Sequence, residues 1–81
     1  MNMLDEFKTS DFPTAATLLA LKHILHVVDR ENPHRAIFIF NRTPRLDSDL
    51  EKIRAGIKID PFDFWNAQKR LKSILYDNTS F

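Results

Sequence analysis

The sequence predicts a single small α+β domain in the order β-α-β-β-α-α, with a three-stranded antiparallel sheet packed by helices. Two segments rich in β-branched and aromatic residues, 24–30 and 36–40, flank a turn sequence. Three other segments have helical periodicity and begin at helix-start signals. The length of 81 residues leaves room for one domain, 1–81. We expect an ordered core over about residues 6–76, with frayed termini.

The first two elements are a short strand and a helix. Residues 6–9 alternate polar and apolar side chains, which predicts a strand. Asp11 and Pro13 follow as a helix start, and the Asp11 carboxylate is expected to accept a hydrogen bond from the Thr14 backbone N–H. The apolar side of residues 13–23 predicts that the helix extends to His23.

A hairpin comes next. Residues 24–30 and 36–40 are expected to be strands joined by a turn at Asn32 and Pro33. The second of these strands is apolar throughout, which is typical of a central strand. The first strand should therefore pair with it, giving the strand order 1-3-2.

Alternation along this central strand assigns its side chains to two faces. Ala36, Phe38 and Phe40 share one face, and Ile37 and Ile39 share the other. Helices of this length cannot easily cover both faces of the sheet. The uncovered face is therefore expected to be an exposed apolar patch.

Two helices with clear boundaries complete the chain. Thr43 followed by Pro44 predicts a helix start, and the single glycine, Gly56, is expected to end that helix with a positive φ. Asp60 followed by Pro61 opens the last helix in the same way. The apolar positions with the best periodic support should be nearly fully buried: Leu19, Phe38, Leu50, Phe64 and Leu71.

Four motifs together resemble an uncharacterised family of short bacterial and phage proteins. They are FxTxD at 7–11, AAxLL at 15–19, FxFxxTP at 38–44 and IDPxxF at 59–64. The resemblance covers nearly the whole chain. It implies an origin in bacterial or phage genomes, often on mobile elements, and no assigned activity. Members of the family usually carry Gly near His23, which this chain lacks.

Composition excludes several classes of protein. No Cys and one Gly exclude a disulfide scaffold, a Cys-ligated zinc module and a glycine-rich phosphate loop. The net charge of +1 indicates no particular partner. The longest apolar run, 36–40, is far shorter than the roughly 20 residues of a membrane span, so we expect no membrane partner. No secretion signal is visible, which predicts a cytoplasmic location.

The sequence offers no convincing catalytic or metal site. A metal would need His23 and His26 to converge with a carboxylate such as Asp11 or Asp29, but the change from helix to strand falls between the two histidines. The acidic residues of the last two helices crowd the helix starts, where capping explains them. We therefore expect no enzyme activity, no catalytic or metal-binding residue and no cofactor.

Two functions remain, and the first is a small non-enzymatic protein-interaction module. Its partner would be another protein or a second copy in a homodimer. The expected interface residues are Ile37, Ile39 and Trp65.

The alternative is a nucleic-acid-binding accessory protein with an arginine-flanked sheet and a basic last helix. The candidate contacts are Arg30, Arg35, Arg42, Arg45, Lys69, Arg70 and Lys72. Arg35, Arg42 and Arg45 are expected to be exposed, without a structural partner, and to make the main contacts.

Overall fold

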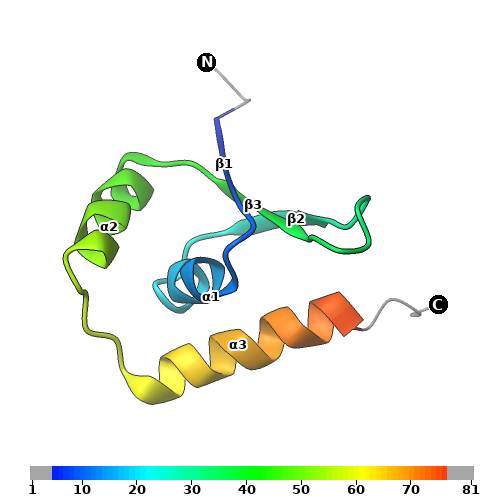
Figure 1. Ribbon diagram of the computed structural model, residues 1–81. Helices are drawn as coiled ribbons and strands as arrows, with labels where there is room; N and C mark the ends of the chain where they lie inside the picture. Colours follow the sequence, from blue (N-terminus) through cyan, green and yellow to red (C-terminus); the bar gives the residue numbers. More distant parts are fainter. Residues whose placement is uncertain (1–4, 77–81) are drawn as a thin grey trace.

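The order of helices and strands is as the sequence predicts. The computed structural model describes residues 5–76 and contains β1 (Glu6–Thr9), α1 (Phe12–Ala20), β2 (Leu25–Asp29), β3 (Ile37–Asn41), α2 (Pro44–Arg54) and α3 (Pro61–Tyr76) (Figure 1). This confirms the α+β class. No helix within residues 5–76 is long and apolar enough to cross a membrane.

The sheet has the strand order β1-β3-β2, with both pairs antiparallel, so β3 is central as predicted. Phe7 of β1 lies opposite Phe40 of β3. The register of β2 against β3 shifts between Leu25 and Val27, and the extra residue there is His26.

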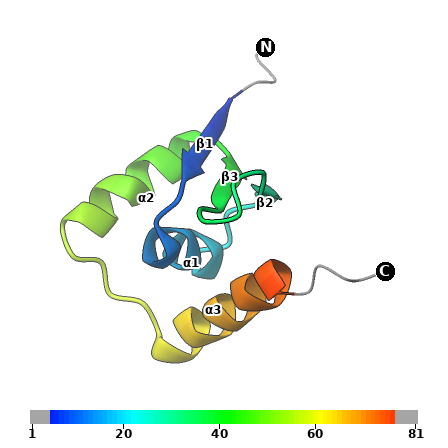
Figure 2. The same ribbon diagram turned by 45° about the vertical axis from the view of Figure 1, so that its right-hand side comes forward.

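The core lies where α1 meets the inner face of the sheet on one side and α3 on the other (Figures 1 and 2). The Phe12 ring of α1 meets the Phe38 ring of β3 edge to face, with 6.1 Å between ring centroids. The largest fully buried side chains come from four elements: Leu18, Phe38, Phe40, Leu46 and Leu71.

The two ends of α1 are fixed by local hydrogen bonds. Asp11 is the N-cap as predicted, and its Oδ2 accepts from the Thr14 backbone N–H at 3.1 Å. The helix ends at Ala20, so the prediction that it extends to His23 is wrong. The physical reason is a closing turn in which the N–H of His23 donates to the carbonyl of Leu18.

Lys22 occupies the position in this closing turn that usually holds glycine. Its φ is +74°, the only positive φ of a non-glycine residue in the described part of the chain. The Lys22 N–H donates to the carbonyl of Leu19. This completes the two hydrogen bonds typical of an α-helix that ends at a residue in the left-handed conformation. The missing glycine explains why sequence patterning placed this helix end too late.

Helix α2 begins and ends as predicted. The Thr43 hydroxyl accepts a hydrogen bond from the Leu46 N–H at 3.0 Å. The helix ends at Arg54, and Gly56 has a φ of +93°.

Three of the five predicted core residues are nearly fully buried: Leu19 is 7% exposed, Phe38 2% and Leu71 0%. Leu50 and Phe64 are only half-buried, so the prediction of nearly full burial is wrong for them. Both pack against the rim of the core, on helices that diverge from each other in Figure 1.

We expect Gly56→Val to lower the free energy of unfolding by about 1 kcal/mol or more in urea titrations. A Cβ at this position would meet no atom within 4 Å, so the cost comes from the positive φ and not from a clash. Gly56→Asn should cost less, because asparagine tolerates positive φ better than valine. Equal stability of Gly56→Val and the wild type would contradict this account.

Candidate functional site

Helix α3 is built with one side in the core. Asp60 caps its start, and Asp60 Oδ1 accepts from the Phe62 backbone N–H at 2.8 Å. Ala67 and Leu71 point into the core and are 4% and 0% exposed. These contacts fix the rotation of the helix about its axis and so decide which residues face solvent.

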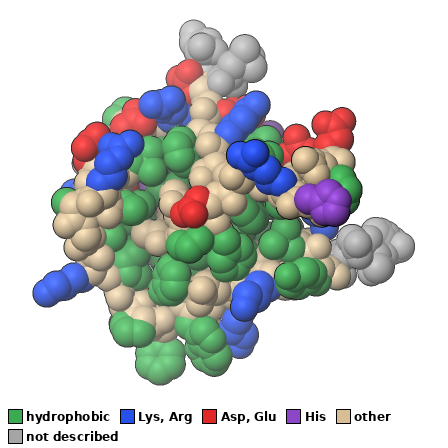
Figure 3. Space-filling view, viewed as in Figure 1, with side chains coloured by type: hydrophobic (Ala, Val, Ile, Leu, Met, Phe, Trp, Pro, Cys, Tyr) green, Lys and Arg blue, Asp and Glu red, His purple; other side chains and the backbone are tan. Residues whose placement is uncertain are grey.

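The opposite side of α3 carries five residues at alternating spacings of three and four, which place them on one helix face. We call them the outer face of α3: Phe62, Trp65, Lys69, Lys72 and Tyr76. The three aromatic residues are 69%, 54% and 76% exposed, in that order. Figure 3 shows hydrophobic side chains gathered over the start of α3, with Lys and Arg side chains further along the helix.

This face gathers half of the large apolar side chains that residues 5–76 expose. The others are Ile24, Val27 and Ile74, which lie elsewhere. Single exposed apolar residues are ordinary on protein surfaces, whereas a contiguous group of them is typical of an interaction surface.

The charges on the outer face of α3 are both positive. Lys69 Nζ lies 4.6 Å from the centre of the Trp65 ring, a cation–π contact one helical turn along. The nearest acidic residue of the helix, Asp63, lines a hollow with Leu19 and Lys22 on another side of α3. The outer face therefore combines aromatic rings with ammonium groups and carries no carboxylate of its own.

The two isoleucines expected at an interface lie on the outer face of the sheet. Ile39 is only 9% exposed, between Lys8 of β1 and Val27 of β2, and Ile37 is half-buried. The expected bare apolar patch is therefore wrong at Ile39, because β3 is the central strand and Ile39 is flanked by residues of both neighbouring strands. Trp65, the third expected interface residue, is exposed.

Arg30, one of the seven basic candidates, joins the hairpin to the end of α3. Its Nη1 donates to the carbonyls of Ile74 and Leu75, each at 3.1 Å. A cation at a helix C-terminus offsets the negative end of the helix dipole. Arg30 therefore has a structural role.

Arg42 and Arg45 also have structural partners. Arg42 Nε lies 2.9 Å from Asp47 Oδ1, and Arg45 Nη1 donates to the carbonyl of Leu21 at 3.1 Å. Their side chains are 50% and 57% exposed, as expected. The prediction that they lack structural partners is wrong, because Asp47 in the first turn of α2 accepts from Arg42 and the Leu21 carbonyl at the end of α1 accepts from Arg45.

The other four basic candidates lie in three places. The side chain of Arg35, on the hairpin, makes no hydrogen bond or ion pair within residues 5–76. Lys69 and Lys72 lie on the outer face of α3, whereas Arg70 lines hollows beside Lys22. The structure does not bring the seven candidates into one basic surface.

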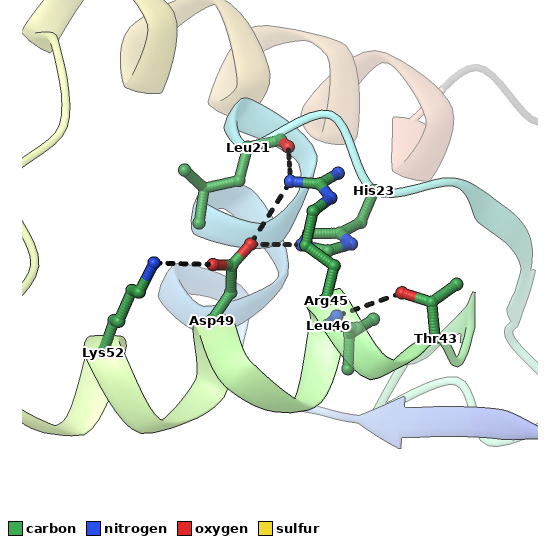
Figure 4. A network of polar contacts seen from close by, with 7 residues as sticks. All are labelled: Leu21, His23, Thr43, Arg45, Leu46, Asp49 and Lys52. Atoms are coloured by element: carbon green, nitrogen blue, oxygen red, sulfur yellow. Dashed lines mark hydrogen bonds and ion pairs between the residues drawn. The ribbon is translucent and has the colours of Figure 1, made fainter.

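A buried hydrogen bond between His23 and Asp49 links α2 to the turn between α1 and β2 (Figure 4). His23 Nε2 lies 2.7 Å from Asp49 Oδ2, and the two residues are 5% and 6% exposed. The Asp49 carboxylate also lies 3.4 Å from Arg45 Nη1 and 3.9 Å from Lys52 Nζ. No unpartnered buried side-chain nitrogen or oxygen remains in the described part of the chain.

This pair was missed by the sequence analysis, which treated Asp49 as a residue of an acidic helix start. The available signal was its position: Asp49 falls on the same side of α2 as Leu46, Leu50 and Ile53. His23 pairs with Asp49, while His26 lies exposed in the strand. No three His, Asp or Glu side chains within residues 5–76 are grouped so that they could hold a metal ion.

Comparisons with protein-family models, curated proteins and solved structures find no match to this chain. The family resemblance suggested by the motifs stays a prediction.

We expect Asp49→Ala to destabilise the fold by about 1–3 kcal/mol, because it leaves the buried His23 ring without a partner. The matched control is Asp47→Ala, which removes an exposed ion pair and should cost less than about 1 kcal/mol. The double variant His23→Leu, Asp49→Leu should recover part of the loss, since no polar group remains buried. Urea titrations showing equal costs for the two alanine variants would contradict a structural role for the pair.

Proposed function

We propose that this chain is a small non-enzymatic protein-interaction module that binds its partner through the outer face of α3. In keeping with the family resemblance, we place its origin in a bacterial, phage or mobile-element genome and its action in the cytoplasm. The observation that carries the proposal is the exposure of Phe62, Trp65 and Tyr76 on one helix face.

The spacing of these residues supports binding in a groove. Helices that dock into apolar grooves present apolar anchors at i, i+3 and i+7; Phe62 and Trp65 occupy the first two of these positions, and Lys69 occupies the third. Trp and Tyr are enriched among the residues that dominate binding energy at protein interfaces. The partner should therefore offer an apolar groove for the aromatic rings.

The charge on the face favours a partner with acidic side chains. Lys69 and Lys72 would be complemented by carboxylates beside the groove. Antiparallel packing of two copies of this face would place Lys69 near its counterpart, and like charges disfavour that arrangement. A different protein is therefore the favoured partner, ahead of a homodimer.

The non-enzymatic part of the proposal is supported by the acidic residues. Asp11 and Asp60 cap helices, Asp47 pairs with Arg42, and Asp49 pairs with His23. Each of these four carboxylates has a structural partner, which accounts for it without a catalytic role.

Nucleic-acid binding is the second candidate, and one observation favours it. Trp65 and Tyr76 are exposed beside Lys69 and Lys72, and single strands bind to surfaces where bases stack on aromatic rings near cations. Against it, Arg42 and Arg45 are engaged in structural contacts, and the seven basic candidates do not form one surface.

We expect Trp65→Ala to abolish capture of a specific protein partner by the tagged chain from cells of its source. The indole is more than half exposed, so its removal should leave the fold intact. Capture should persist after nuclease treatment. The matched control is Ile24→Ala, which removes an apolar side chain that is 63% exposed elsewhere and should leave capture unchanged.

Two outcomes would contradict the proposal. Loss of capture after nuclease treatment would favour the nucleic-acid function. An equal loss of capture in Ile24→Ala and Trp65→Ala would show that the outer face of α3 has no special role.

A further inference from the structure

A hollow of about 640 Å³ lies between the β2–β3 hairpin and the last turn of α3. The hairpin loop and the end of α3 lie close together in both ribbon views (Figures 1 and 2). Arg30, at the start of the loop, donates hydrogen bonds to the carbonyls of Ile74 and Leu75 in α3. The lining combines basic and polar side chains with apolar ones: Arg30, Asn32, Pro33, His34, Arg35, Ala36, Leu75 and Tyr76. Its volume falls within the usual range for small-molecule sites.

The cations of the hollow differ in how they are held. The two hydrogen bonds from Arg30 Nη1 to the end of α3 fix the orientation of that guanidinium group. Arg35 makes no such contact within residues 5–76, so its guanidinium is available to a ligand. The backbone before Arg35 is ordered by hydrogen bonds to Asn32: the Arg35 N–H donates to its carbonyl and the His34 N–H to its side chain.

The acidic residues of the hairpin line an adjoining hollow, which shares Asn32 and Arg35 with the first. Asp29 and Glu31 line a second hollow, together with Arg35 and Ile37. No acidic side chain is among the described residues that line the first hollow. An anion there would meet two guanidinium groups and an imidazole, with no carboxylate among its described neighbours.

The hollow also has an apolar wall. Tyr76 is 76% exposed and lines the hollow, and Pro33 adds a second apolar surface. Arginine binds phosphate through two parallel N–H groups, and an exposed aromatic ring can stack on a base.

We propose that this hollow binds a nucleotide, with its phosphate on Arg35 and Arg30 and its base against the Tyr76 ring. Two kinds of ligand carry a phosphate group next to a heterocyclic ring: a free nucleotide and the phosphorylated end of a single nucleic-acid strand. This site is separate from the protein-binding function proposed above, although Tyr76 borders both surfaces.

The test is a titration followed by NMR chemical shifts of the full chain. AMP should give saturable shifts in residues 32–36, adenosine should give none, and inorganic phosphate should bind more weakly than AMP. Arg35→Gln should weaken AMP binding at least about tenfold, the loss expected when a charged hydrogen-bonding group is removed. Tyr76→Ala should weaken AMP binding but leave phosphate binding unchanged.

Two control variants separate this site from other surfaces. Arg54→Gln removes an exposed arginine that pairs with Glu51 on α2, and Trp65→Ala removes an aromatic ring from the outer face of α3. Both should bind AMP as the wild type does. Titrations with tetrathymidylate, with and without a 5′-phosphate, distinguish the two kinds of ligand. If the phosphorylated strand binds more tightly than AMP, the ligand is a strand end. If AMP binds more tightly, the ligand is a free nucleotide.

The proposal would be overturned by the absence of saturable shifts at about 10 mM AMP. Equal binding by the wild type and Arg35→Gln, or an equal response to adenosine and AMP, would overturn it as well.

Discussion

The packing of α1 between the sheet and α3 is the contact on which the rest of the structure depends. Ala15, Ala16 and Leu18 are completely buried, and Leu19 is 7% exposed. Neighbouring residues on a helix point in different directions, so burial of all four means that α1 is covered on more than one side. The small alanine side chains allow this close approach, and α1 supplies one core shared by the sheet and α3.

This arrangement explains why α3 presents aromatic residues to solvent. Its inner side, with Ala67 and Leu71, is used to pack against α1. A chain of 81 residues has no further element within its described part to cover the other side. Phe62, Trp65 and Tyr76 therefore have no core role, and the size of the domain leaves them available to a partner.

Sequence reasoning succeeded where the information is local. The caps at Asp11 and Thr43 and the helix end at Gly56 depend on residues within one turn, and the structure has all three. It failed where the partner is distant or the signal is missing. Asp49 and His23 are 26 positions apart, and Lys22 ends α1 without the glycine that would have marked the turn.

The candidate site was predicted in part for the same reasons. Trp65, Lys69 and Lys72 were recognised as candidates from their residue types. Phe62 and Tyr76 were not assigned to the surface, because aromatic residues are more often buried and their exposure depends on how α3 rotates against α1. Arg42 and Arg45 were overestimated as free cations, since their acceptors lie on neighbouring turns and elements.

The central claim is that the outer face of α3 serves binding and not stability. The most direct test compares the free energy of unfolding of the triple variant Phe62→Ala, Trp65→Ala, Tyr76→Ala with that of Leu71→Ala. We predict a loss of about 1 kcal/mol or less for the triple variant and about 2–5 kcal/mol for Leu71→Ala. A triple variant as unstable as Leu71→Ala would show that these aromatic residues belong to the core, and would contradict the account.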